Sequence, residues 1–270
     1  MTTIPVFLYH SVSDHPPQWL APYTVSPRAF KLQLDRIQDA GRRIVPLRRL
    51  VAALHGGPAL PPDAAVLTFD DGYADFYWTV APELADRGLA ATLYLTVGAI
   101  HPPGRRAGGS LLPATPMLNW RQVTTLDTLG IEIGGHSVTH VPLDTVYGRR
   151  LDEEITGCKH RLEDALGHPA TAYAYPHGYS SRAVRAKVRT AGWTSAAAVE
   201  NRLSTENDDP LRISRLMVHQ DTPARVFDRW ALGRGARLAP APESLYTRAW
   251  RSYRRVRTAL GSPVGGPPQT

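Results

Sequence analysis

The chain has 270 residues, 43% hydrophobic and 20% charged, a balance that suits one large soluble domain. Its net charge is +7, but no zinc-finger spacing or RNA-binding signature accompanies the charge, so we expect no nucleic-acid partner. The single cysteine, Cys158, excludes an intrachain disulfide and a cysteine-rich metal site, and its helical sequence context favours a buried core residue. No run of about 18 apolar residues is present, which excludes a membrane-spanning helix.

Strand-like apolar runs alternate with amphipathic helical patterns along most of the chain. In chain order, the predicted strands are residues 5–10, 64–72, 91–98, 131–136, 171–178, 193–199 and 211–218. Helices are predicted at residues 26–41, 76–88, 119–130, 145–167 and 180–192. In the first helix, Ser26 serves as the cap, Pro27 lies in the first turn and Gly41 ends the pattern.

This repetition predicts an α/β fold in which a parallel sheet is covered by helices. About seven strand–helix units, within residues 1–238, would close a barrel, with the active site at the carboxyl ends of its strands. Several polar residues fall at or just after those ends and would share one rim: His10, Asp70, Asp71, His136, His140 and His177.

Two of these motifs carry chemistry. Asp70 and Asp71 stand side by side directly after a strand; one could cap the next helix, but the second would be an unpaired charge at a half-buried position. Neighbouring carboxylates can take different roles, so that one binds a metal while the other abstracts a proton. His136 and His140 are four residues apart, which puts both imidazoles on one side of a helical turn. With an aspartate they form a metal-binding set that leaves positions open for water and substrate.

TFDDGY and HSVTH resemble the first two motifs of the polysaccharide deacetylase (NodB-homology) family, and YAYPHG resembles the third. The resemblance covers roughly Pro5 to Val218 and implies an irregular (β/α) barrel. It also implies a metal-dependent carbohydrate esterase that removes N-acetyl or O-acetyl groups from sugars. By motif, Asp70 is then the general base, the metal ligands are Asp71, His136 and His140, and the backbone N–H of His177 helps to hold the oxyanion.

The sequence departs from the family pattern in two places. Ala174 occupies the position where the third motif often carries an arginine that pairs with the base; Arg215 is either its replacement or a surface arginine on an edge strand. The general acid is usually a histidine in a late L-x-x-H motif, which LMVH, ending at His219, fits. The alternative is His10, since YHSV resembles the start of a permuted branch that includes exopolysaccharide deacetylases. We favour His10 and keep His219 in reserve.

The ligand types suit Zn²⁺, with Co²⁺, Ni²⁺ and Mn²⁺ as alternatives. Trp120 and Tyr23, in loops near the rim, are candidate platforms for sugar stacking or ordinary packing residues. The expected function is the metal-dependent removal of an N-acetyl group from an amino sugar, glycoconjugate or lipid-linked glycan. The alternatives are an amidase or deformylase acting on another small or lipid-linked amide, and a non-catalytic glycan-binding barrel.

Residues 239–270 are predicted to form a basic amphipathic helix, within residues 243–261, followed by a disordered tail. No acidic residue occurs from Ser244 onward, while five arginines crowd together: Arg248, Arg251, Arg254, Arg255 and Arg257. The helix either docks on the barrel or makes peripheral contact with an anionic membrane surface. Because the N-terminus lacks the features of a signal peptide, we expect a cytoplasmic protein, with the inner membrane face as the alternative location.

Overall fold

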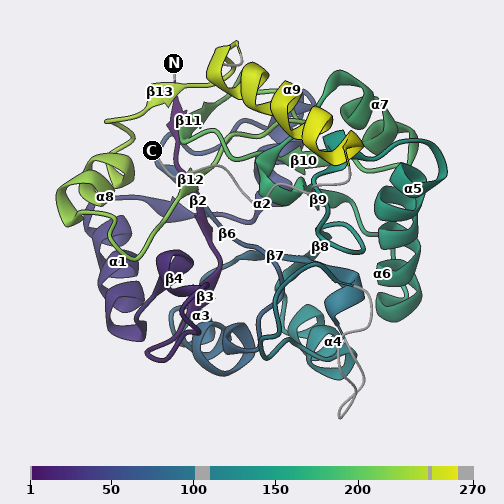
Figure 1. Ribbon diagram of the computed structural model, residues 1–270. Coiled ribbons are helices and arrows are strands. Elements are labelled where there is room, and N and C mark those ends of the chain that lie inside the picture. The colour runs from purple at the N-terminus through teal and green to yellow at the C-terminus, as the bar shows by residue number, and fades with distance from the viewer. Residues whose placement is uncertain (1, 101–109, 243–244, 261–270) are drawn as a thin grey trace.

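The structure is a computed structural model that describes residues 2–100, 110–242 and 245–260. Of the eight strands in its main sheet, seven form one path in which neighbouring strands pair in parallel (Figure 1). Their spatial order is β10 (Ser195–Ala197), β9 (Ala172–Ala174), β8 (Glu132–Gly135), β7 (Thr92–Leu95), β6 (Ala64–Phe69), β2 (Val6–Tyr9) and β12 (Leu216–Met217). The predicted α/β fold, with about seven parallel strands in an irregular barrel, is confirmed.

The segment that leads into β12 links the two edges of this curled sheet. Ile213 forms a parallel bridge with Ala197 of β10, while Leu216 pairs with Phe7 of β2. Arg215 lies between these two attachments and is fully buried. This segment therefore brings a charged side chain into the interior of the barrel.

Helices surround the strands, as Figure 1 shows. They are α1 (Pro27–Asp39), α3 (Ala81–Asp86), α4 (Trp120–Thr128), α5 (Gly148–Asp152), α6 (Cys158–Leu166), α7 (Arg182–Thr190) and α8 (Ala224–Ala231). Local sequence explains several of their starts: the Ser26 hydroxyl caps α1 by accepting from the Ala29 N–H, and Asn119 and Gln122 form a capping box at α4. Two π-helical turns, η2 (Phe76–Val80) and η5 (Glu153–Gly157), precede α3 and α6.

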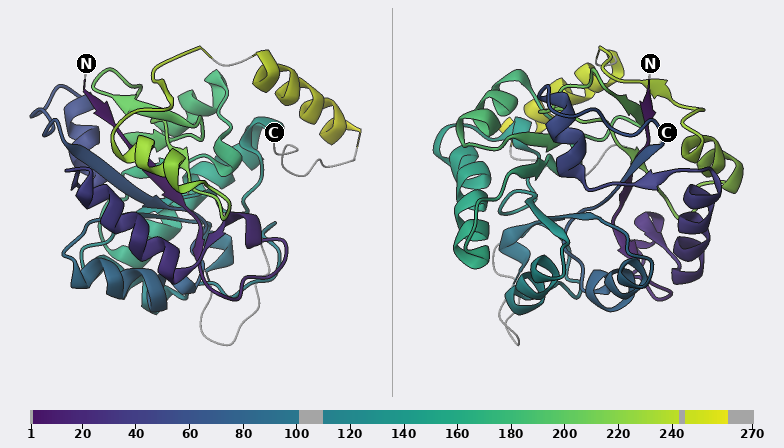
Figure 2. Two further views of the ribbon diagram at one scale, coloured as in Figure 1. Left: turned by 90° about the vertical axis from the view of Figure 1, so that its left-hand side faces the viewer. Right: turned by 180° about the vertical axis from the view of Figure 1, so that it is seen from behind.

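Two hydrophobic clusters fill the molecule. The larger lies between the strands and the surrounding helices and includes Cys158, which is buried as expected. The smaller combines Tyr94 and smaller apolar side chains of the barrel strands with Leu47, Leu50 and Val51 of α2 (Leu47–Leu54). This cluster closes the end at which the strands begin, and the α2 ribbon crosses that end of the barrel in Figure 2, right. The opposite end is left for the polar residues that follow the strands.

Several short elements were not predicted, among them α2, α8 and a small sheet of β1 (Thr3–Ile4), β11 (Arg202–Thr205) and β13 (Arg237–Leu238). Other short strands are β3 (Ser11–Val12), β4 (Thr24–Val25) and β5 (Arg43–Ile44). A helix, α9 (Leu245–Ala259), forms within the predicted C-terminal helical segment, while the expected disordered tail, 261–270, lies outside the described residues. In the part of the chain that the structure describes, no helix combines the length and apolar character needed to span a membrane.

Candidate active site

The polar residues that follow the strands lie together at the carboxyl end of the barrel. Four of them adopt left-handed backbone conformations that side chains usually avoid, with φ of 77° at Asp71, 66° at Ser137, 65° at His140 and 58° at His177. Such strain persists only where the surrounding structure enforces it, and it gathers at functional sites. Gly72, at φ 89°, continues the tight turn, where an added Cβ would lie 2.8 Å from Leu95.

The predicted ligand set converges at this rim. Asp71 Oδ1 lies 3.4 Å from His136 Nε2 and 3.2 Å from His140 Nε2. The other carboxylate oxygen, Oδ2, accepts a hydrogen bond from the Tyr73 hydroxyl at 2.8 Å. Tyr73 therefore fixes the carboxylate so that Oδ1 faces both imidazoles.

The tautomer of His136 follows from its partner on the far side of the ring. His136 Nδ1 lies 2.9 Å from the Ala174 carbonyl, which can only accept, so Nδ1 carries the proton and Nε2 keeps its lone pair. Burial lowers the pKa of His136 to about 4, and the nearby Asp70 and Asp71 charges only partly oppose this effect. The ring is therefore neutral near pH 7, the state in which an imidazole binds a metal.

One carboxylate oxygen and two imidazole nitrogens, all within 4.8 Å of one another, provide the donor set of a divalent cation site. The buried Asp71 Oδ1 has no hydrogen-bond partner among the described residues, although an unpaired buried carboxylate oxygen is costly. A cation between Asp71, His136 and His140 would satisfy that oxygen. The residues present therefore fit a bound divalent ion.

Asp70 lies beside this set but is held by a different group. Arg215 Nη1 donates to Asp70 Oδ1 at 2.7 Å and Nη2 donates to Oδ2 at 2.8 Å, and both side chains are buried. Arg215 Nε also donates to the Ala198 carbonyl at 3.1 Å. Burial alone would raise the pKa of Asp70, but the charges of Arg215 and His136 and the Arg215 hydrogen bonds hold it below its ordinary value. The carboxylate is therefore ionised and fixed in orientation.

Both candidate acids lie around Tyr23. The Tyr23 ring centroid is 5.3 Å from the His10 ring and 5.6 Å from the His219 ring. His10 Nδ1 is buried without a hydrogen-bond partner among the described residues. Burial lowers the pKa of His10, while the charges of Asp71 and Asp70 act in the opposite direction. His10 is therefore close enough to interact with both aspartates.

Sequence reasoning missed two carboxylates that hold the loops of the site, the buried Glu154 and the partly buried Asp75. Glu154, on the π-helical turn η5, accepts from the Val138 and Thr139 N–H groups at 3.0 and 2.8 Å, and from the Thr139 hydroxyl. Asp75 accepts from the Ser11 hydroxyl and from the Val12 N–H, directly after His10. Both lie in helical stretches where a glutamate or aspartate normally faces solvent, so no local pattern marks them.

The third motif places His177 against the ligand set, with its ring centroid 4.6 Å from that of His140. Gly178, at φ 72°, lies where a Cβ would be 2.5 Å from Val199, so only glycine fits. Trp120, a candidate sugar platform, packs partly buried against the larger core cluster. Its proposed role in binding sugar stays a prediction.

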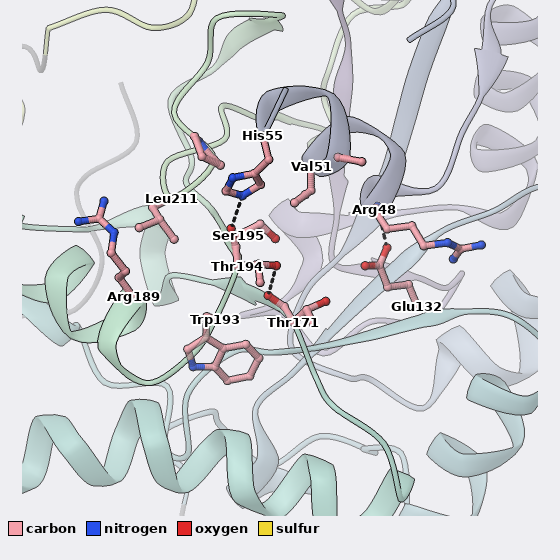
Figure 3. A pocket seen from close by; sticks show the side chains of 12 residues that line it. Arg48, Val51, His55, Glu132, Thr171, Arg189, Trp193, Thr194, Ser195 and Leu211 are labelled. Carbon is pink, nitrogen blue, oxygen red and sulfur yellow. Dashed lines mark hydrogen bonds between the residues drawn. The ribbon is translucent and has the colours of Figure 1, made fainter. Parts of the chain in front are cut away.

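A separate cavity of about 570 Å³ lies at the other end of the barrel (Figure 3). It is lined by residues at the start of strands, including Glu132 and Ser195, and by His55, the residue after α2, whose Nε2 lies 3.0 Å from the Thr194 carbonyl. None of the predicted site residues lines it. The candidate ligands and the candidate base therefore lie away from this cavity.

A parallel barrel with a carboxylate pair and two imidazoles on its carboxyl-end rim defines a class of protein: barrels whose donor set fits a divalent cation beside a second carboxylate, here held by Arg215. Comparison with known proteins narrows the class. The family model described as polysaccharide deacetylase matches residues 58–196, which include Asp70, Asp71, His136, His140 and His177. The chain belongs to the polysaccharide deacetylase family.

Individual relatives agree with this assignment. YxkH of Bacillus subtilis (strain 168) is 21% identical over 225 residues, which span 83% of this chain and 74% of that protein. The poly-beta-1,6-N-acetyl-D-glucosamine N-deacetylase of Escherichia coli (strain K12) is 39% identical over 61 residues, 23% of this chain and 9% of that protein.

Two solved structures share the fold over most of their length. IcaB from Ammonifex degensii has a TM-score of 0.72 at 23% identity and covers 86% of this chain and 98% of its own. The Streptococcus pyogenes deacetylase PplD, in complex with acetate, has a TM-score of 0.70 at 21% identity and covers 81% of this chain and 93% of its own.

Proposed function

We propose that this protein is a metal-dependent hydrolase that removes the N-acetyl group from an amino sugar within a glycan or glycoconjugate. The observation that carries the proposal is the buried Asp70–Arg215 pair, which lies beside a separate set of cation ligands. A binding module would need no ionised, oriented carboxylate next to a cation site. Family membership supports the same reaction class.

The ligands in this proposal are Asp71, His136 and His140, and Zn²⁺ suits them, with Co²⁺, Ni²⁺ or Mn²⁺ as alternatives. A divalent ion held there would supply Lewis acidity, polarising an acyl oxygen and making a water molecule easier to deprotonate. Tyr73 and the Ala174 carbonyl keep the donor atoms aimed at a common point.

The chain itself would move the protons. Asp70 would accept a proton from the attacking water, because Arg215 keeps its carboxylate ionised and oriented. The backbone N–H of His177 would donate to the oxygen that gains negative charge at the acyl carbon. A histidine must then protonate the leaving amine, which is otherwise too basic to depart. We assign this step to His10, which directly follows β2, whereas His219 lies two residues after β12. The charges of both aspartates also act on the His10 ring.

The substrate class comes from the relatives rather than from the geometry. The Escherichia coli relative is named as acting on poly-beta-1,6-N-acetyl-D-glucosamine, so β-1,6-linked N-acetylglucosamine is the first substrate to test. Lipid-linked glycans, and peripheral membrane contact through residues 243–261, stay predictions.

The test is acetate release from β-1,6-linked N-acetylglucosamine oligomers by purified protein, before and after chelation and metal replacement. An O-acetylated sugar and a simple formamide serve as comparison substrates for the competing hydrolase activities. We expect release from the N-acetyl sugar that stops with chelator and returns with added metal. Release that chelation leaves unchanged would refute metal dependence, and preference for the formamide would favour a deformylase.

A further inference from the structure

The C-terminal helix α9 lies over the carboxyl end of the barrel, near β9 and β10 in Figure 1 and on the same side as β3 and β4 in Figure 2, left. One face of this helix carries Arg251, Arg254 and Arg255, spaced so that all three point in one direction. These side chains face the barrel: Arg254 is 1% exposed. The helix therefore brings charged side chains to the catalytic end.

All three arginines converge on Asp144, whose side chain is fully buried. Arg254 Nη2 donates to Asp144 Oδ2 at 2.6 Å, and Arg251 Nε lies 3.2 Å from the same oxygen. Arg255 Nε donates to the Asp144 carbonyl at 3.0 Å. Asp144 lies four residues after His140, so α9 is tied to the segment that carries this candidate ligand.

The same helix also contacts the third motif. The Arg254 guanidinium carbon lies 3.4 Å from the centroid of the Tyr179 ring, and Trp250 Nε1 donates to the Tyr179 hydroxyl at 3.1 Å. Tyr179 stacks on His177, with centroids 6.1 Å apart, and His177 in turn contacts His140. Arg254 thus touches both segments, one through Asp144 and the other through Tyr179.

We propose that Arg254 is a positioning residue of the active site, holding the His140 segment against the His177 segment by binding Asp144 and covering the Tyr179 ring. A buried ion pair contributes little net stability, because desolvation of both charges offsets their attraction. It does fix geometry, since a planar guanidinium must satisfy a carboxylate at its edge and a ring at its face. The catalytic part of this inference rests on the proposed function.

The test compares Arg254→Met, Arg254→Lys and the control Arg257→Met in the full-length protein. Arg257 lies exposed on the same helix, so its replacement removes an equal charge without touching either segment. The measurements are amide hydrogen exchange in residues 136–147 and 175–180, competition for metal with a chelating dye, and kcat and KM. Exchange requires neither metal nor substrate, so it reports on positioning even if the proposed reaction is wrong.

For Arg254→Met we expect exchange at least about tenfold faster in both segments, roughly 10–100-fold weaker metal retention, and a larger fall in kcat than rise in KM. Arg257→Met should match wild type. Lysine keeps a charge opposite Asp144 but cannot cover the Tyr179 ring with a planar group. Arg254→Lys should therefore speed exchange in residues 175–180 more than in 136–147. If the methionine variant does not fold, this difference between the two segments tests the proposal. Unchanged exchange in both segments, or equal effects from Arg257→Met, would overturn the proposal.

Discussion

Arg215 binds both carboxylate oxygens of Asp70, at 2.7 and 2.8 Å, although 145 positions separate the two residues in the sequence. The two-pronged contact fixes the plane of the carboxylate as well as its charge. Arg215 belongs to the segment that links the two edges of the sheet. The same segment therefore closes the barrel and orients the candidate base.

The first prediction concerns the pH dependence of turnover. Asp70 must be ionised to accept a proton, so kcat/KM should fall as the pH is lowered through its pKa. Burial raises this pKa, but the charge and hydrogen bonds of Arg215, together with the charges of His136 and His10, hold it below the ordinary value of 3.8. In Arg215→Met only burial and the weaker histidine charges remain, so activity should be lost at a pH higher by about one unit or more.

The measurement is a pH profile of kcat/KM for wild type, Arg215→Met and Arg212→Met. Arg212 pairs with Glu200, away from Asp70, so its replacement controls for loss of a nearby positive charge. An acid limb that stays in place in Arg215→Met would show that Arg215 does not set the ionisation of the base.

The second prediction separates the two candidate acids. His10→Ala should retain metal while turnover of the N-acetyl substrate falls by roughly 10²–10⁴. An activated ester needs little proton donation, so the same variant should hydrolyse it comparatively well. His219→Ala should be mild on both substrates. The reverse pattern, measured as the ratio of the two activities in each variant, would assign the acid to His219.

The third prediction concerns Glu154, which binds the segment between His136 and His140. Glu154→Ala removes the carboxylate that accepts from the Val138 and Thr139 N–H groups and from the Thr139 hydroxyl, so the segment should loosen. We expect metal affinity to fall about 10–100-fold in a chelator competition assay. Glu153→Ala, on the exposed side of the same turn, is the matched control. Equal metal affinities in the two variants would show that the Glu154 contact does not support the candidate ligands His136 and His140.

The sequence was most informative where chemistry is local. The adjacent aspartates and the H-x₃-H spacing each lie within one strand-to-loop junction, and a parallel barrel necessarily brings such junctions to one rim. The placement of Asp71 with His136 and His140 could therefore be expected from pattern alone, although their roles as ligands stay predictions.

Distant partners could not be identified in this way. Arg215 could equally have been a surface residue, because its burial depends on how a short, irregular segment joins both edges of the sheet. Glu154 and Asp144 resemble solvated acids in helical or turn sequence, yet one is turned inward by a π-helical turn and the other is covered by α9. The choice of acid stayed open for a related reason: His10 and His219, over 200 residues apart in sequence, both contact the ring of Tyr23.

The most direct test of a metal-dependent deacetylase is metal content and acetate release measured together in wild type, Asp70→Asn and His140→Ala. We predict about one divalent ion per chain in wild type and in Asp70→Asn, loss of that ion in His140→Ala, and loss of most turnover in both variants. Asp70→Asn isolated without metal would mean that the two aspartates have exchanged roles. Full metal occupancy with normal turnover in His140→Ala would contradict the account.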